Sequence, residues 1–502
     1  MASVTTTIIV LSLFLIILLS ISFLASRSNI STPDDFYLAN RGLGTIVMVM
    51  TTGASFFSTW TLLGAVGSYY RGGVWFIAFA AWAIVHAMFI WIFGARIWYL
   101  GKKYNFVTPG ELIEKYYKSS TLRLLFAVIG IIGLVPYMLI QVTGGASALN
   151  SLTGEQIPYW IGVLIMGAFV GLIVTLSGGR GAAWSDTFMG FFFGFVLIFI
   201  TAIFFMNTGG VNALKSIENV APEILTNHGD FWGIFDTALG LGLGYWVMPH
   251  MWQKFYSAKS PMILAKTSVI TPFWNSWLMA CGALFIGILA HYPGLVPGIT
   301  AANSDQIIPV FFSSYAPIFG SIVVAAILAA GISTINSQML SSASLLVTDI
   351  YVRFFNKDVT VKQTTVIGKT TVLALTGLVV LLSFLPAAQG FLVPLASLGF
   401  AISIQLVPAA IGPLLWRKAS TTAAILSIIV GEVALTLVYL LGSPLPMGPA
   451  ASGIILASIV FFGGSLLDNR EPSAIQNEFH DTLVSKLYGN GKKSNSYIKN
   501  TN

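Results

Sequence analysis

Charged residues and cysteine are scarce in this sequence. Asp, Glu, Lys and Arg make up 9% of its 502 residues, whereas they make up about 25% of an ordinary soluble domain. Hydrophobic residues make up 56%, and the mean hydropathy is +0.83. This balance excludes a soluble globular protein and predicts a polytopic membrane protein. The only cysteine, Cys281, stands in an apolar run, so an internal disulfide is excluded as well.

Motifs of catalysis and nucleic-acid binding are also missing. There is no HExxH, no P-loop, no GxSxG and no cluster of His and Cys ligands. The net charge of +7 comes from basic residues scattered between apolar runs, which is not a nucleic-acid footprint. We therefore expect no enzyme. A channel or a membrane sensor is an alternative of a different class, although the sequence has no filter-like repeat and the polar tail 467–502 is too short for an output domain.

Apolar runs of about 20 residues, the length that crosses a bilayer as a helix, recur thirteen times. We expect helices at residues 5–25, 44–70, 73–98, 122–149, 158–178, 184–206, 232–252, 264–291, 317–350, 365–386, 389–415, 420–441 and 447–466. An odd number of spans places the two termini on opposite sides of the membrane.

Basic residues indicate which side is the cytoplasm. With the N-terminus outside, only Arg71 and Lys215 of the 25 lysines and arginines fall on the outer side. Cytoplasmic loops carry an excess of Lys and Arg, and one mistaken helix would invert every later loop. The segregation therefore predicts a multi-pass protein of the cell membrane with its N-terminus outside and a flexible polar tail, 467–502, in the cytoplasm.

The stretch 328–349 carries hydroxyls on one face of an apolar helix. The residues that share this face, at spacings of three and four, are Ala330, Ser333, Thr334, Ser337 and Ser341. In hydrocarbon, such hydroxyls bond to carbonyls one turn earlier or to a neighbouring helix. Taken alone, the pattern is therefore compatible with helix packing as well as with a binding site.

Two spans contain sequences that weaken a helix. The span 44–70 carries Gly53 among clustered hydroxyls, and the span 232–252 carries alternating glycines followed by Pro249. Paired broken helices point to a transport site near the middle of the membrane. Small residues at Gly240 and Gly244 are equally compatible with close helix packing.

The two weakened spans are the second and the seventh, which is the spacing of an inverted repeat of five plus five helices. One extra helix would precede the repeats and two would follow them. The expected division is an extra N-terminal helix and cytoplasmic loop (1–43), the first repeat (44–206), an extracellular loop (207–231), the second repeat (232–415), two peripheral helices (416–466) and the cytoplasmic tail (467–502).

Six motifs stand in order along the chain. They are residues 35–41 (DFYLANR), 53–60 (GASFFSTW), 177–180 with 183–186 (SGGR, AWSD), 242–246 with 249–250 (GLGYW, PH), 333–334 (ST), and 405–408 with 416–417 (QLVP, WR). In this order the chain resembles the sodium:solute symporter family, which includes proline, pantothenate, monocarboxylate, sialic acid and sodium/glucose symporters. The resemblance implies an all-α membrane protein with the LeuT-type inverted repeat, which couples solute uptake to Na+.

The resemblance also implies a sodium site between the first and eighth core helices. Its ligands would be the carbonyl oxygens of Ala54, Phe57 and Ala330 and the hydroxyls of Ser333 and Thr334. Unwound carbonyls and hydroxyls suit a hard monovalent cation. A second sodium site or a gate would use Asp186, Asn336 and Ser337.

Polar and aromatic residues near the two breaks are the expected substrate ligands. They are Ser58, Thr61, Tyr137, Gln141, Tyr245, Trp246 and Gln405. Aromatic walls with a few amides and hydroxyls suit a small polar organic solute, an organic acid such as a monocarboxylate or an amino acid. The central helices show no obvious buried Arg or Lys, so a carboxylate would be met by backbone N–H groups at the helix breaks.

A proton-coupled symporter on the same fold is the main alternative, and it would use Asp186 or Glu432. His86 fits a core imidazole better than a proton relay, and Asp236 fits a solvated helix end. The expected partners are a small-molecule substrate and the lipid bilayer. The expected mechanism is alternating access, in which sodium and solute each favour binding of the other.

Overall fold

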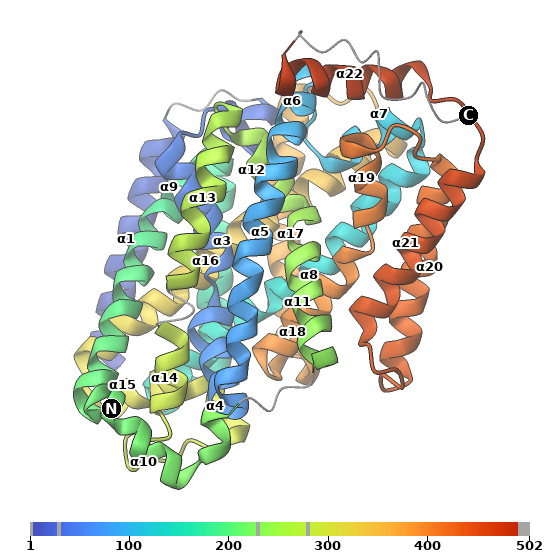
Figure 1. Ribbon diagram of the computed structural model, residues 1–502. Coiled ribbons are helices and arrows are strands. Elements are labelled where there is room, and N and C mark those ends of the chain that lie inside the picture. The colour runs from blue at the N-terminus through green and yellow to red at the C-terminus, as the bar shows by residue number, and fades with distance from the viewer. Residues whose placement is uncertain (1–3, 28–31, 227–230, 278–281, 490–502) are drawn as a thin grey trace.

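The computed structural model describes residues 4–27, 32–226, 231–277 and 282–489, and the secondary structure of these ranges is helical without a strand. Cys281 lies outside them. Most helices run along one direction in Figure 1, while α22 lies across one end of the bundle and α10 lies at the other. We call these the α22 end and the α10 end. The N-terminal helix α1 begins near the α10 end.

The helix bounds follow the chain from one end to the other. The first half contains α1 Val4–Ser26, α2 Pro33–Leu38, α3 Thr45–Phe56, α4 Val66–Gly72, α5 Ala81–Phe89, α6 Ala95–Tyr104, α7 Pro109–Tyr117, α8 Ser120–Leu152, α9 Tyr159–Thr208 and α10 Ala213–Val220. The second half contains α11 Phe231–Val247, α12 Pro249–Ser257, α13 Pro261–Trp277, α14 Leu284–Leu289, α15 Ile307–Tyr315, α16 Pro317–Ser344, α17 Val361–Leu382, α18 Leu392–Ile404, α19 Val407–Leu415, α20 Thr421–Leu440, α21 Pro449–Leu467 and α22 Ala474–Tyr488. Two π segments extend these helices: η2 Trp60–Ala65 leads into α4, and η9 Leu345–Phe355 continues α16.

Each of the thirteen expected ranges covers helical segments, although short non-helical stretches such as residues 57–58 and 390–391 interrupt two of them, and residues 278–281 fall outside the described chain. By length and composition, seven described helices are able to cross a membrane, or nine if each bent pair is one span. Helix α9 covers two expected ranges because Gly178, with φ of 57° and ψ of −156°, kinks it between them. A straight helix of 50 residues would be about 75 Å long, more than twice a hydrocarbon core.

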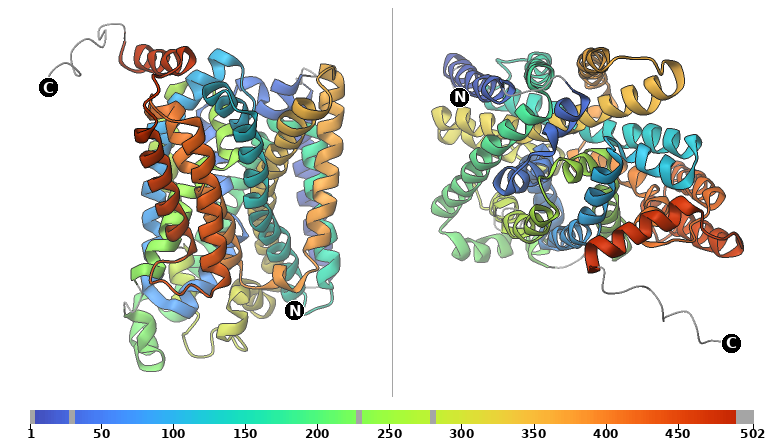
Figure 2. Two further views of the ribbon diagram at one scale, coloured as in Figure 1. Left: turned by 90° about the vertical axis from the view of Figure 1, so that its right-hand side faces the viewer. Right: turned by 90° about the horizontal axis from the view of Figure 1, so that it is seen from above.

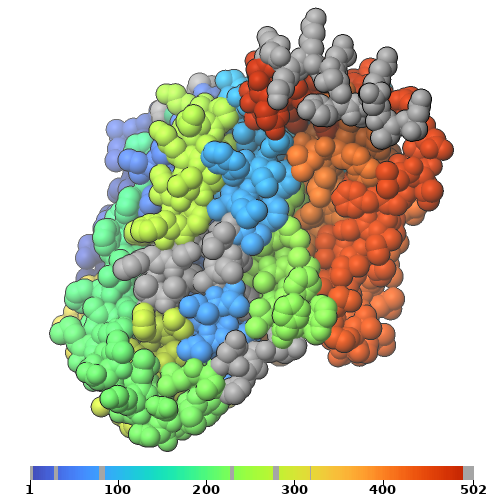
Figure 3. Space-filling model, viewed as in Figure 1, coloured from blue at the N-terminus to red at the C-terminus, as the bar shows by residue number. Residues whose placement is uncertain are grey.

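Helix α16 forms the centre of the bundle, where it packs against α1, α3, α8, α9 and α17. Its residues from Ala330 to Ile335 are buried. The helices α20 and α21 pack against each other at one side of the molecule (Figure 2). Their outer faces expose Leu437 and Leu466, and the C-terminal surface in orange and red lies along the right of Figure 3. Buried hydroxyls at the centre and exposed apolar residues outside are what a bilayer requires.

The tail differs from the expectation of a flexible segment. Residues Ala474–Tyr488 form the helix α22, which begins with a capping box between Ser473 and Gln476. Its apolar residues Phe479 and Leu483 are buried. The helix lies across α6, α7 and α19, as Figure 1 shows for the α22 end. A polar composition concealed this docking because only one face of α22 is apolar.

Candidate ion and substrate site

The first helix break lies between α3 and η2, as the clustered hydroxyls and Gly53 indicated. The segments on either side meet at 52°, and Phe57 has an extended backbone with φ of −80° and ψ of 106°. Ser58 caps the second segment, because its Oγ accepts a hydrogen bond of 3.1 Å from the Trp60 N–H. Thr61 reaches back across the break and donates to the Phe56 carbonyl at 3.4 Å.

The break places backbone carbonyls against the hydroxyl face of α16. The Ser333 Oγ lies 3.0 Å from the carbonyl oxygens of both Ala54 and Ala330. The Thr334 Oγ1 lies 3.1 Å from the same two oxygens and 3.5 Å from that of Phe57. All five residues are at most 1% exposed. We call this cluster the hydroxyl site.

Oxygen lone pairs outnumber protons in the hydroxyl site. Ser333 and Thr334 supply one proton each, whereas five close contacts join their hydroxyls to carbonyl oxygens. Each hydroxyl can donate to only one of these carbonyls at a time. A small cation would satisfy the remaining lone pairs, so the donor set fits a hard monovalent ion and needs no fixed negative charge.

The second helix break lies at Met248, between α11 and α12, where ψ is 139° and Pro249 opens the next helix. The glycines upstream stay helical. Gly244 packs so closely on α18 that a Cβ there would lie 2.5 Å from the Phe400 carbonyl oxygen. Of the two alternatives left open for these glycines, close packing explains Gly244, while Pro249 accounts for the break.

Two of the expected substrate residues meet at the first break. The Tyr245 Oη donates to the Ser55 carbonyl at 2.7 Å, and the Tyr137 Oη donates to the same oxygen at 3.2 Å. The Phe56 ring stacks on Tyr245, with centroids 4.3 Å apart. His86 packs edge-on against Phe56 at 4.0 Å, so it is a core imidazole next to the break. Together these rings enclose the polar Ser55 carbonyl with aromatic walls.

Gln141 joins α8 to the break from the other side. Its Oε1 accepts hydrogen bonds from the Thr59 N–H at 3.2 Å and from the Thr59 Oγ1 at 3.0 Å. Its Nε2 donates to the Tyr137 carbonyl at 3.0 Å. Gln141 therefore fixes the position of the break relative to Tyr137.

Trp246 and Gln405 do not face the break. Trp246 follows Tyr245 by about 100° around the helix, and its ring stacks on Phe93 at 4.2 Å. Gln405 stands where α18 bends by 48° into α19. Its amide points at the peripheral helices, where a Cβ on Gly431 would lie 2.6 Å from its Oε1. Helix rotation and the α18–α19 bend thus turn both side chains away from the first break, and their role in binding solute stays a prediction.

A buried lysine that the sequence reasoning missed lies next to Asp186. The Lys254 ammonium donates to the Thr51 carbonyl at 3.0 Å, to the Thr51 Oγ1 at 2.7 Å and to the Ser337 Oγ at 3.1 Å. Thr51 Oγ1 in turn donates to Asp186 at 2.8 Å. The expectation that the central helices hold no buried Lys or Arg is therefore wrong. His250 lies four residues before Lys254, on the same face of α12. Its Nε2 forms a hydrogen bond of 3.3 Å with the Tyr245 Oη.

Two other acidic residues lie away from the breaks. The Asp236 Oδ1 accepts a hydrogen bond of 2.7 Å from the Ala451 N–H at the start of α21, so it caps that helix. Glu432 is half-buried in α20, and its Oε1 has no hydrogen-bond partner among the described residues.

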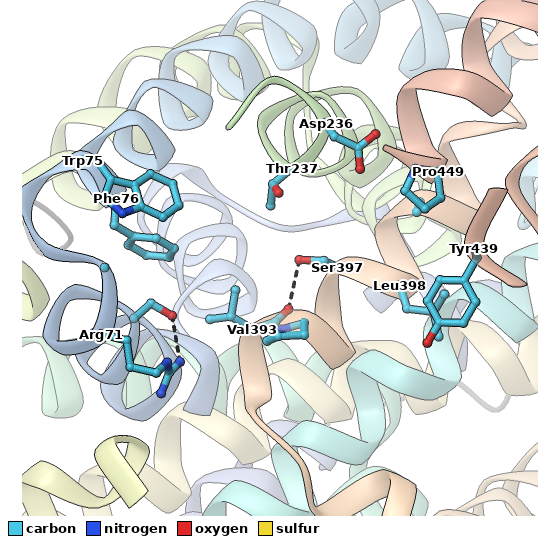
Figure 4. A pocket seen from close by; sticks show the side chains of 14 residues that line it. Arg71, Trp75, Phe76, Asp236, Thr237, Val393, Ser397, Leu398, Tyr439 and Pro449 are labelled. Atoms are coloured by element: carbon cyan, nitrogen blue, oxygen red, sulfur yellow. Dashed lines mark hydrogen bonds between the residues drawn. The ribbon is translucent and has the colours of Figure 1, made fainter. Parts of the chain in front are cut away.

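A cavity of about 470 Å³ lies toward the α10 end, beyond the first break. Figure 4 shows Trp75 and Phe76 on one side of it, and Asp236 and Pro449 on the other. At its edge Arg71 pairs with Asp305 at 2.8 Å. Its volume is within the range of small-molecule sites.

Comparisons with known proteins agree with this arrangement of broken helices. The sequence matches the model of the Sodium:solute symporter family over residues 36–431. The chain belongs to the sodium:solute symporter family. It is therefore a sodium-coupled solute symporter, a multi-pass membrane transporter and not an enzyme.

Two of the relatives compared with this symporter have named substrates. It is 26% identical to the sodium/pantothenate symporter of Escherichia coli over 489 residues, which are 92% of this chain and 96% of that protein. It is likewise 26% identical to the sodium/proline symporter of Escherichia coli, with 95% and 96% covered. An uncharacterized symporter of Bacillus subtilis, YhjB, is 25% identical, with 89% and 93% covered.

Solved structures show the same fold. A Na+-coupled sialic acid symporter in a substrate-bound, outward-open state aligns with a TM-score of 0.79 at 18% identity, covering 93% of this chain and 98% of that one. The nucleobase-cation-symport-1 transporter Mhp1, in a closed conformation, aligns with a TM-score of 0.57 at 15% identity, covering 90% and 99%. The symporter thus has the LeuT fold that the six motifs implied.

Proposed function

We propose that this symporter takes up a small organic acid or amino acid into the cell together with sodium, which binds in the hydroxyl site. The observation that carries the proposal is the excess of oxygen lone pairs over protons around Ser333 and Thr334. These hydroxyls on α16 and the Ala54 and Phe57 carbonyls on the broken α3 belong to different elements. A bound ion would therefore tie the break to α16 and favour one arrangement of the two.

The solute would bind at the aromatic walls beside the hydroxyl site. Tyr137 and Tyr245 line the polar Ser55 carbonyl, and Phe56 excludes water from it. Ser58 and Thr61 hold the second half of the break in place. Pantothenate, proline and sialic acid, which name the substrates of the compared symporters, all carry a carboxylate. This shared group supports an organic acid or an amino acid as the class of solute.

The orientation and the division of the chain complete the proposal. Lys103 and Arg417 bond to Thr482 and Asp481 on α22 itself. Arg353 pairs with Glu114 on α7, against which α22 packs. The α22 end, where these basic residues gather, would therefore face the cytoplasm. The segments 44–206 and 232–415 would be the two inverted repeats. The membrane potential then favours inward movement of each sodium by about 2.3 kcal/mol per 100 mV, so solute uptake is driven by the ion.

Uptake into liposomes containing the purified protein tests this function. Labelled pantothenate, proline and short monocarboxylates are offered in turn, with an inward sodium gradient or with choline in its place. We expect one of these solutes to accumulate only with the sodium gradient. Accumulation driven by a proton gradient without sodium would instead favour the proton-coupled alternative, with Asp186 or Glu432 as the carrier.

A further inference from the structure

Lys254, on α12, bonds to both of the helices that form the hydroxyl site. On each of these helices, the residue that it bonds to is one helical turn away from the hydroxyl site. Thr51, which accepts two of its hydrogen bonds, is three residues before Ala54 on α3. Ser337, which accepts the third, is three residues after Thr334 on α16. Residues three apart on a helix stand one above the other. The ammonium is therefore in line with the hydroxyl site, between the same two helices.

The ammonium has the surroundings of a bound cation. Its three protons have three acceptors, at 3.0, 2.7 and 3.1 Å. The Asp186 carboxylate, 1% exposed, stands behind Thr51 and balances the positive charge. Ser337 lines the same small cavity as this carboxylate, and it is preceded on α16 by Asn336, whose buried amide has no hydrogen-bond partner among the described residues. We call this group of residues, Thr51, Asp186, Lys254, Asn336 and Ser337, the lysine layer.

The lysine layer borders a small cavity of about 40 Å³. The cavity is also lined by Tyr37, Gly179 and Ser257, and it has room for an ion or for water. Asp186 Oδ1 has no hydrogen-bond partner among the described residues. The oxygens and the space for a cation are thus present in addition to the ammonium itself.

We propose that the Lys254 ammonium is a tethered cation that occupies a second cation position, so that this symporter binds one sodium ion and not two. Asp186, Thr51 and Ser337 would coordinate a free cation with the same oxygens that now accept from Lys254. Two like charges in so small a buried volume repel each other strongly. The lysine therefore excludes a second sodium. This inference rests on the proposed function, because it requires sodium in the hydroxyl site.

Counting the bound ions tests the inference. Radioactive sodium is titrated into the purified full-length protein, and the number of ions per chain is measured at saturation. Wild type should bind one ion. Lys254→Met removes the charge and keeps most of the side-chain volume, so this variant should bind two. Lys254→Arg, which keeps the charge, is the matched control and should bind one.

Two further variants locate the added ion. Lys254→Met combined with Asp186→Asn lacks both charges and should return to one ion. Lys254→Met combined with Ser333→Ala and Thr334→Ala should also bind one, now held by Asp186. If Lys254→Met does not fold, Lys254→Gln replaces it in the same series.

The possible failures are distinguishable. Two ions in wild type, or one ion in a folded Lys254→Met variant, would overturn the inference and leave the proposed function intact. No bound sodium in wild type would contradict the proposed function and this inference together.

Discussion

The hydroxyl site and the lysine layer lie one turn apart between α3 and α16, and they meet the needs of a cation in opposite ways. The hydroxyl site has carbonyls and two hydroxyls with too few protons and no charge. The lysine layer has a carboxylate and already contains a positive charge. The uncharged site is suited to an ion that must come and go. The charged layer is suited to a permanent occupant, whose removal would leave a buried carboxylate uncompensated.

The largest expected effect comes from removing that permanent occupant. In sodium-free choline buffer, Lys254→Met should lower the free energy of unfolding by about 3 kcal/mol, because loss of one partner leaves Asp186 buried and unbalanced. Unfolding in a detergent titration measures the change. Adding Asp186→Asn should recover most of the loss. Equal stability of wild type and Lys254→Met in choline would contradict the claim that the lysine layer needs a permanent positive charge beside Asp186.

A smaller effect should separate the solute from the ion. Tyr245→Phe removes the hydrogen bond to the Ser55 carbonyl, and we expect solute affinity to fall by about 1 kcal/mol, roughly fivefold. Sodium affinity measured without solute should not change. Tyr159→Phe, which removes a similar bond to the Ser383 carbonyl on α17's end, is the control and should leave solute affinity unchanged. A fall in sodium affinity in Tyr245→Phe would contradict the separation of the solute site from the hydroxyl site.

The smallest expected effect is a local loss of stability in α22 at low pH, without a change at the hydroxyl site. Burial, and the nearby charge of Arg417, lower the pKa of His480 to about 4, from about 6.5 in an unfolded chain. A depressed histidine pKa adds stability above the unfolded value, and this stability is lost as the pH falls from about 6.5 toward 4. Hydrogen exchange in α22 should rise over this range, and less so in His480→Gln. Sodium affinity should stay constant while α22 opens.

The sequence pattern was sufficient to predict two parts of the hydroxyl site separately. Helix spacing places Ser333 and Thr334 on one face, and Gly53 with its hydroxyl neighbours indicates a helix break. Both features depend on local helix geometry, whereas the meeting of Ala54 and Phe57 with these hydroxyls was implied only by the family resemblance. The assignment of sodium to the cluster remains a prediction.

The lysine layer was not predictable in the same way. The charge rule assigns Lys254 to the cytoplasmic side and says nothing about where its side chain points. That direction depends on how α12 restarts after Met248. Gln405 was misplaced for a related reason, since the bend between α18 and α19 turns it outward. Where a chain breaks and restarts, the direction of a side chain depends on tertiary packing and not on spacing.

Thermal unfolding across a sodium titration, with choline at equal ionic strength, tests the central claim most directly. Purified wild type is compared with the variant that combines Ser333→Ala and Thr334→Ala. A ligand that binds only the folded protein stabilises it by RT ln(1 + [L]/Kd), so we expect the unfolding temperature of wild type to rise with sodium and that of the variant to stay constant. An equal rise in both proteins would contradict the hydroxyl site as the place where sodium binds.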